Sequence, residues 1–208
     1  MSVIIAVDGP AASGKGTLAR RLAARYGLRH LDTGLLYRAV GLKVEREGAD
    51  PAAAAGALTL ADLESPLLRA EGAAQAASRV AVIPAVREAL RLLQRRFAAE
   101  APGAVLDGRD IGTVVFPEAP VKIFVDATPE ARARRRHREL LDRGVASIYS
   151  RVLQDMKDRD ARDRDRAVAP LTPAKDAFVI DSSKLDADGV FALAVAHIGR
   201  VLPDLARG

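Results

Sequence analysis

The sequence of 208 residues contains no cysteine and no tryptophan, and only three histidines. Without cysteine the chain cannot form disulfide bonds, a thiolate zinc site or a cysteine nucleophile, which suits a reducing compartment. The histidines, His30, His137 and His197, are too few and too far apart in the sequence to indicate a histidine-rich metal centre. Aromatic residues make up 4% of the chain, too few for a surface on which single-stranded nucleic acid stacks its bases.

The chain also lacks an apolar run of the ~18 residues that a membrane-spanning helix needs. Its first residues carry no basic segment before the apolar stretch, so we interpret that stretch as a strand and not a signal peptide. We therefore expect a soluble, cytoplasmic protein. Its length fits one domain over residues 1–208, and 49% hydrophobic with 28% charged residues is typical of a globular fold.

The formal net charge is +5, from 32 basic and 27 acidic residues. Such an excess could serve nucleic acid, an anionic membrane surface or small phosphorylated ligands. Composition alone does not choose among these partners.

The hydrophobic pattern predicts strands that alternate with helices. The first strand, at residues 3–7, is continuous and β-branched, as in a strand buried on both faces. The further predicted strands are 28–31, 104–107, 121–126 and 177–180, and the predicted helices are 15–26, 33–47, 73–100 with an interruption at Pro84, 129–143, 147–162 and 187–202. This order indicates an α/β fold, a parallel five-stranded sheet with helices on both faces. Residues 49–71 are alanine-rich and broken by proline and glycine, which indicates an insertion or mobile segment.

A glycine-rich loop lies between the first strand and the first helix. It matches the phosphate-loop pattern of two glycines five residues apart followed by lysine, in Gly9, Pro10, Ala11, Ala12, Ser13, Gly14, Lys15, Gly16 and Thr17. Backbone N–H groups of such a loop and the positive end of the helix bind phosphate oxygens, and Lys15 reaches the outer phosphates. A tripolyphosphate is the expected ligand, against the alternative of a tight turn with an exposed lysine. The hydroxyl that usually follows the lysine is displaced to Thr17, so Mg²⁺ is expected to be held mostly by phosphates and water.

Three further segments carry a family resemblance. They are LDTGLLYR at residues 31–38, GRDIGTVVFP at 108–117 and RDRAVAPL at 164–171. Together with the GKGT form of the loop and Ala76, Ala77 and Ser78, they resemble the bacterial cytidylate kinases of the nucleoside monophosphate kinase family. The resemblance implies a P-loop kinase fold, a short monophosphate-binding insertion at about residues 49–100, and an arginine-bearing lid at about 132–143.

The resemblance also implies roles for single residues. It assigns the acceptor phosphate to Arg38 and Arg109, the cytosine to Ser78, Arg87 and Asp110, the ribose to Arg159 and Asp163, and the phosphates to Arg166, with Thr33 and Tyr37 beside the substrate. Guanidinium groups suit phosphate, and a carboxylate can accept a hydrogen bond from the amine that cytosine has and uracil lacks. Taken singly, Arg38 and Arg87 could equally be solvated helix charges, and Asp110 could close a turn.

Asp107 ends an apolar stretch, at the position where phosphate-loop enzymes place a carboxylate near magnesium. We interpret Asp107, with Thr17, as a candidate metal ligand. A turn-closing role is the alternative for Asp107.

Arg132, Arg135 and Arg136 fall on one helical face, and the resemblance makes them catalytic residues of a lid that closes over ATP. The alternative is a basic surface helix or a nucleic-acid contact. In residues 155–166 opposite charges recur at helical spacing and indicate a self-paired, solvated helix. We assign no function there to Asp158, Asp160 or Arg162.

The chain departs from the family pattern in its insertion. Residues 58–72 leave room for little more than 58–60 and 67–69 where many relatives carry antiparallel strands, so monophosphate preference could differ. The expected activity is transfer of the γ-phosphoryl group of ATP to CMP and dCMP, with Mg²⁺. The alternatives are a kinase of UMP or a metabolite hydroxyl and, less favoured, an ATP-regulated nucleic-acid-binding module. We expect a monomer with small-molecule partners, and neither nucleic acid nor membrane.

Overall fold

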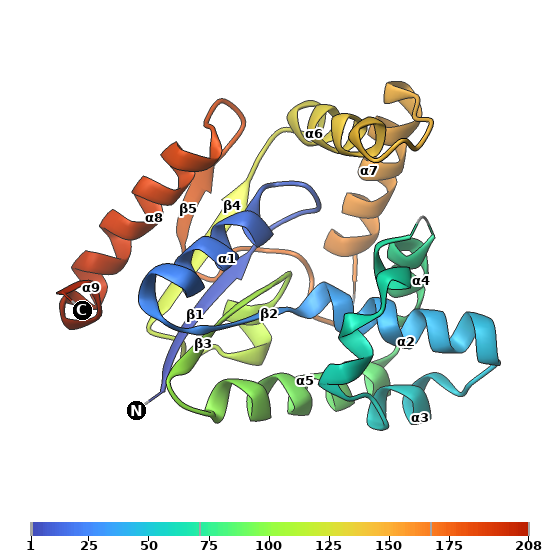
Figure 1. Ribbon diagram of the computed structural model, residues 1–208, viewed down its shortest axis with the longest axis horizontal. Helices are drawn as coiled ribbons and strands as arrows, with labels where there is room; N and C mark the ends of the chain where they lie inside the picture. The colour runs from blue at the N-terminus through green and yellow to red at the C-terminus, as the bar shows by residue number, and fades with distance from the viewer. Residues whose placement is uncertain (1, 71, 167, 208) are drawn as a thin grey trace.

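The computed structural model describes residues 2–70, 72–166 and 168–207 of the chain. Its centre is a sheet of five parallel strands in the order β2-β3-β1-β4-β5 (Figure 1). The strands are β1 (Val3–Asp8), β2 (Arg29–Asp32), β3 (Gly103–Gly108), β4 (Val121–Asp126) and β5 (Phe178–Asp181). The predicted parallel five-stranded α/β fold is confirmed, with strand ends shifted by about one residue.

Helices alternate with most of the strands, and two follow the last strand. They are α1 (Lys15–Tyr26), α2 (Thr33–Glu47), α3 (Pro51–Gly56), α4 (Ala73–Val80), α5 (Pro84–Ala99), α6 (Pro129–Asp142), α7 (Tyr149–Arg164), α8 (Ala187–Val201) and α9 (Pro203–Arg207). Two 3₁₀ turns, η1 (Leu60–Glu64) and η2 (Pro66–Arg69), and a π-helical turn, η3 (Ile111–Val115), complete the elements. The predicted helices 15–26 and 33–47 match α1 and α2, and the predicted interruption at Pro84 separates α4 from α5.

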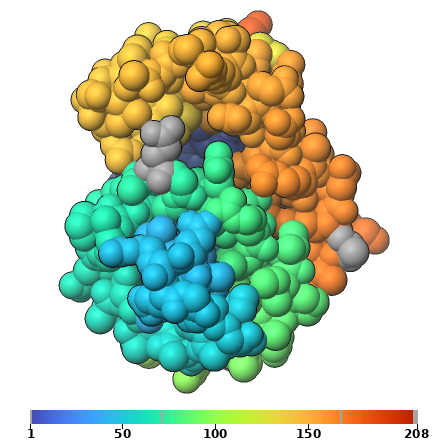
Figure 2. Space-filling view, turned by 90° about the vertical axis from the view of Figure 1, so that its right-hand side faces the viewer, coloured from blue at the N-terminus to red at the C-terminus, as the bar shows by residue number. Residues whose placement is uncertain are grey.

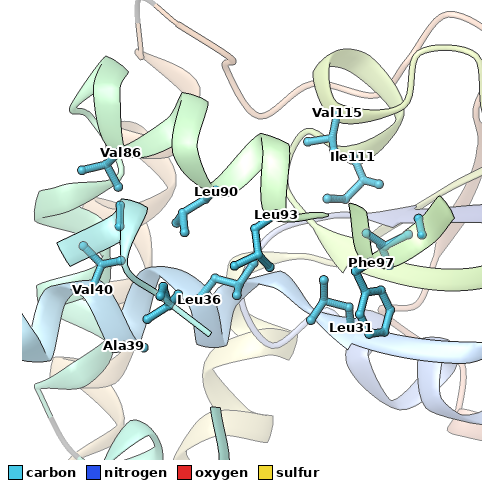
Figure 3. Packing of buried hydrophobic residues seen from close by; sticks show 14 of the residues in the cluster. Leu31, Leu36, Ala39, Val40, Val86, Leu90, Leu93, Phe97, Ile111 and Val115 are labelled. Carbon is cyan, nitrogen blue, oxygen red and sulfur yellow. The ribbon is translucent and has the colours of Figure 1, made fainter. Parts of the chain in front are cut away.

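Each face of the sheet has its own hydrophobic core because successive strand residues point to opposite faces. Ile5 and Val7 of β1 pack in the cluster that includes α1 and α8, whereas Ala6 packs in the cluster that includes α2, α3 and α5. Figure 3 shows Leu90 of α5 and Leu36 of α2 in this second cluster, and both are fully buried. Helices therefore cover both faces, as predicted.

The predicted insertion is folded over its described residues. α3 begins at an N-cap, where Asp50 accepts a hydrogen bond from the Ala53 N–H at 2.8 Å. The segments 58–60 and 67–69 contribute to the turns η1 and η2 and form no antiparallel strands. Leu68 of η2 is buried against the core of α2 and α5. This part of the insertion therefore consists of one short α-helix and two 3₁₀ turns.

α6 and α7 form a hairpin that lies apart from the other helices in Figure 1. Its own core is small, with Ala133, Val152 and Met156 buried between the two helices. Among the described residues, no helix combines the length and the apolar character that crossing a membrane requires.

Candidate active site

The loop between β1 and α1 owes its shape to two glycines. Gly9 has φ 149°, and a Cβ atom there would lie 2.1 Å from the backbone oxygen of Val125, so glycine is required. Gly14 is the N-cap of α1 in the left-handed region, at φ 95°. The loop and the first turn of α1 open onto a cavity of about 310 Å³. Backbone N–H groups and the positive end of α1 make this end of the cavity suited to phosphate.

The predicted loop residues divide into two groups. Ala11, Ala12, Gly14, Lys15, Gly16 and Thr17 line the cavity, whereas Gly9, Pro10 and Ser13 are not part of its lining. Ser13 supports the loop from behind, because its backbone oxygen accepts a hydrogen bond of 2.8 Å from the Ser182 hydroxyl. Arg135 donates to the same oxygen at 3.3 Å.

Lys15 is folded back onto its own loop. Its Nζ donates to the backbone oxygen of Pro10 at 3.3 Å. Burial, and next the positive charge of Arg109, lower the pKa of Lys15 to about 7. A bound polyphosphate would restore the charged form, since opposite charges nearby favour ionisation.

Most of the residues that the sequence assigned to the acceptor also line this cavity. Figure 2 shows the hollow between the α6–α7 hairpin, in yellow to orange, and the segments from α2 to α5, in blue to green. The predicted residues in its lining are Thr33, Tyr37, Arg38, Ser78, Arg87, Arg109, Asp110, Arg159 and Arg166. Residues spread from position 11 to position 166 therefore meet in one place.

Asp163 lies behind this lining and joins three arginines. Its carboxylate, 1% exposed, accepts a hydrogen bond from Arg109 Nε at 2.8 Å and one from Arg166, and Arg159 Nε lies 3.9 Å away. Burial alone would raise the pKa of Asp163, but the three guanidinium groups outweigh it and hold the pKa below its usual range. The i, i+4 face predicted for Arg159 and Asp163 is confirmed.

The three arginines outnumber the carboxylate that holds them. Burial and the charges of its neighbours lower the pKa of Arg159 to about 9, and burial lowers that of Arg166. The Nε atoms of both side chains are buried and have no hydrogen-bond partner among the described residues. Three guanidinium groups in the lining of one cavity suit the oxygens of a phosphate or a ribose.

A buried ion pair also lines the cavity. Arg87 donates to the carboxylate of Asp110, with both residues at most 9% exposed. Burial raises the pKa of Asp110, while Arg87 acts in the opposite direction. Ser78 is also buried and lines the same cavity. A carboxylate, a guanidinium and a hydroxyl so placed can read the polar edge of a pyrimidine.

Arg38 has a different environment from the Asp163 cluster. Its Nη1 donates to the backbone oxygen of Leu68 at 3.2 Å, which ties α2 to η2. Burial lowers the pKa of Arg38. Arg38 was predicted beside an acceptor phosphate, and its position in the lining, with Lys15 and Arg109, is compatible with that role.

Asp107 at the end of β3 is held from one side. Its Oδ1 lies 2.8 Å from His30 Nε2, and its backbone oxygen accepts a hydrogen bond from the Thr33 hydroxyl. Its Oδ2 faces Gly16, where an added Cβ would lie 3.5 Å away. Mg²⁺ is usually bound by one or two carboxylates, substrate phosphates and water. Asp107 and Thr17 line the same cavity, and their side-chain oxygens suit such an ion, although Arg20 Nη2 donates a hydrogen bond to the Thr17 hydroxyl at 3.4 Å.

The three lid arginines do not line the cavity. Arg132 is fully buried and forms a bidentate ion pair with Asp160, and Arg136 pairs with Glu139 at 2.8 Å. Arg135 donates to backbone oxygens behind the phosphate loop, as described above. Their predicted catalytic role stays a prediction.

The solvated helix predicted for residues 155–166 is wrong for Asp160, which is 3% exposed because α6 covers it.

Several residues around the cavity were not singled out from the sequence. Arg20, Asp32 and Glu139 line it, His30 contacts Asp107, and Asp8 is buried beneath it. Asp8 and Asp32 end the strands β1 and β2, and this position at the carboxyl edge of a parallel sheet is the signal that could have identified them. The contact of His30 spans 77 residues and has no local signal.

Comparison with solved structures supports the fold. A gluconokinase from Sinorhizobium meliloti superposes with a TM-score of 0.51 at 18% identity, over 98% of this chain and 95% of that one. A sugar kinase from Janibacter sp. gives a TM-score of 0.53 at 16% identity, over 99% of each chain. At these identities the likeness concerns the fold alone.

Sequence comparison gives the family. The sequence model of the cytidylate kinase family matches residues 5–65 and 57–200. The cytidylate kinase of Paramagnetospirillum magneticum is 61% identical over 208 residues, covering 96% of this chain and 99% of its own. That of Xanthobacter autotrophicus is 58% identical over 201 residues, covering 94% and 97%. The chain belongs to the cytidylate kinase family.

Proposed function

We propose that the protein transfers the γ-phosphoryl group of ATP to the 5′-phosphate of CMP or dCMP, giving ADP and the diphosphate. The observation that carries this proposal is one cavity lined both by the phosphate loop and by the Arg87–Asp110 pair with Ser78. A nucleoside triphosphate and a pyrimidine monophosphate would meet end to end between them. Family membership supports both the reaction and the acceptor.

The residues divide between donor and acceptor. The loop N–H groups and Lys15 bind the β- and γ-phosphates of ATP, whereas Arg38, Arg109 and Arg166 bind the phosphate of the acceptor. Arg159 and Asp163 position the ribose, and Tyr37 and Thr33 lie beside it in the lining. Asp110 accepts a hydrogen bond from the exocyclic amine of cytosine. Uracil has a carbonyl oxygen at this position, so it presents no hydrogen-bond donor to the Asp110 carboxylate.

The chemistry needs alignment and positive charge. An oxygen of the acceptor phosphate forms a bond to the γ-phosphorus while the bond from that phosphorus to the β,γ-bridging oxygen breaks, and ADP leaves with the electron pair. The second pKa of a phosphate monoester lies near 6, so the attacking oxygen is already ionised at neutral pH and no general base is required. Lys15 and the arginines of the cavity stabilise the charge that develops on the transferred group.

Asp107 and Thr17 would hold a magnesium ion together with the phosphates and water. When bound, Mg²⁺ neutralises phosphate charge and polarises the transferred group. His30 keeps one Asp107 oxygen engaged and leaves the other facing Gly16.

The test is ADP production with ATP and magnesium against CMP, dCMP, UMP, AMP and GMP. We expect turnover with CMP and dCMP to exceed that with the other acceptors. In Asp110→Ala the preference for CMP over UMP should fall about tenfold or more, the discrimination expected of one base contact. Asp188→Ala is the matched control, because Asp188 is an exposed carboxylate on α8 outside the cavity. Equal rates with purine acceptors in the native protein would overturn the proposal.

A further inference from the structure

Asp8 is a buried carboxylate that the roles proposed above leave unused. It is 6% exposed and ends β1, the central strand, where its backbone pairs with Gly108 of β3 on one side and Phe124 of β4 on the other. It also directly precedes Gly9, the first residue of the phosphate loop. Asp8 therefore lies where the donor half of the site joins the sheet, and its backbone is fixed from both sides.

The side chain of Asp8 reaches across to the acceptor half. Its Oδ1 accepts a hydrogen bond from the Ile111 N–H at 2.8 Å, and its Oδ2 one from the Gly112 N–H at 2.7 Å. These two N–H groups begin the π-helical turn η3, where a helix leaves its first donors without intrahelical acceptors. Asp8 does not touch the cavity, so it acts through the chain that it holds.

The chain that Asp8 holds carries Arg109 and Asp110. These residues lie between the end of β3 and η3, so β3 fixes them on one side and Asp8 on the other. The backbone oxygen of Asp110 accepts from the N–H groups of Val114 and Val115, at 2.9 and 3.1 Å, which makes Asp110 part of the turn that Asp8 caps. The direction of the Asp110 carboxylate thus depends on the anchoring of η3.

The close approach explains two residue choices. A Cβ atom at Gly112 would lie 3.2 Å from two carbons of the Lys122 side chain and 3.4 Å from Asp8 Oδ2, so any larger residue must displace Lys122 and crowd the carboxylate. At position 8 asparagine has one acceptor oxygen, and its amide would face the second N–H with a donor. A carboxylate satisfies both N–H groups, although burial raises the pKa of Asp8 to about 7.

We propose that Asp8 is a positioning residue for acceptor recognition: its two hydrogen bonds to η3 hold Arg109 and Asp110 in register with the phosphate loop. This inference rests on the proposed function, because it concerns the base and phosphate that those two residues bind. It places the determinant of pyrimidine selectivity partly in a side chain that contacts no substrate.

The test compares Asp8→Asn with the native protein. We expect the KM for CMP to rise about tenfold and the preference for CMP over UMP to fall, the effect of losing one buried hydrogen bond in the support of the site. Affinity for a non-hydrolysable ATP analogue, measured by calorimetry, should change less than about threefold, since the loop N–H groups remain in place. The Ile111 and Gly112 amides should lose protection from hydrogen exchange.

Two further variants keep the test decisive. Ile198→Ala removes a fully buried side chain of α8 on the opposite face and provides a control for lost stability alone. Gly112→Ala disturbs the same contact from the other side and should reproduce the loss of selectivity even if Asp8→Asn fails to fold.

Unchanged selectivity in both Asp8→Asn and Gly112→Ala would overturn the inference. So would a uniform loss for CMP, UMP and the ATP analogue that Ile198→Ala reproduces. A native protein that does not phosphorylate CMP would instead refute the proposed function. The two failures are therefore distinguishable.

Discussion

At the scale of single residues, the pKa of Lys15 predicts a proton linked to nucleotide binding. Burial and Arg109 hold this pKa at about 7 in the protein without nucleotide. Polyphosphate stabilises the ammonium form, so at pH 8 binding should take up close to one proton, whereas at pH 6 Lys15 is already charged and uptake should be small. Calorimetry of ATP-analogue binding in buffers of different ionisation enthalpy measures this number.

Lys15→Met is the control for that measurement. It removes the titrating group, so the difference in proton uptake between pH 8 and pH 6 should shrink, together with the affinity. Uptake that does not change between the two pH values in the native protein would contradict the prediction.

Single residues of the candidate site also differ in how far the sequence could predict them. The phosphate loop is local, and its glycines, lysine and flanking elements identify it without tertiary information. The resemblance assigned Arg87 and Asp110 to the cytosine, but it did not predict the ion pair that they form across 23 residues, and neither residue carries a signal of its own. The contacts of Asp8 with η3 span more than 100 residues and depend on which strands become neighbours in the sheet. Periodicity predicts the strands but not their order in the sheet, so the hydrogen bonds between Asp8 and η3 could not be predicted from the sequence.

At the scale of elements, one ion pair joins the α6–α7 hairpin. The small core of the hairpin leaves Arg132 and Asp160 as a buried link between the helices, and Arg132 also donates to the backbone oxygen of Ala11 in the phosphate loop at 3.3 Å. Charge spacing predicted only that arginines share a face of α6. That Arg132 turns inward follows from the packing of α7, which no local pattern reveals.

Asp160→Ala should therefore loosen the hairpin. Removing one partner of a buried pair leaves an unpaired charge, at a cost of about 3–5 kcal/mol. We expect faster hydrogen exchange in α6 and α7, with the amides of β1 and β3 unchanged. Asp158→Ala is the matched control, because Asp158 lies on the exposed side of the same helix and should alter exchange little. Equal protection in the two variants would show that the pair does not hold the hairpin.

At the scale of the whole molecule, the cavity concentrates charged side chains from segments far apart in the sequence. Among the described residues, seven cationic side chains and four carboxylates line it, contributed by α1, by the end of β2 and the segments α2 to α5, by β3 and its end, by the α6–α7 hairpin and by Arg166 just after α7. Without a ligand these cations repel one another, and the pKa values of Lys15 and Arg159 are lowered first by burial and next by the charge of Arg109. Polyanions that span the cavity should therefore stabilise the whole fold.

A dinucleotide with adenosine and cytidine joined by five phosphates tests this expectation. At about 100 times its Kd, a ligand that binds only the folded state adds about 2.7 kcal/mol to the free energy of unfolding, which raises the Tm of a chain of this size by roughly 5–10 °C. The analogue with two adenosines carries the same phosphates without cytosine. At equal concentration it should raise the Tm less, because Arg87, Asp110 and Ser78 then lack their base. Added salt should reduce both shifts, since screening weakens the phosphate contacts. Equal shifts for the two analogues, measured by calorimetry of unfolding, would mean that the cavity binds phosphate but does not read the base.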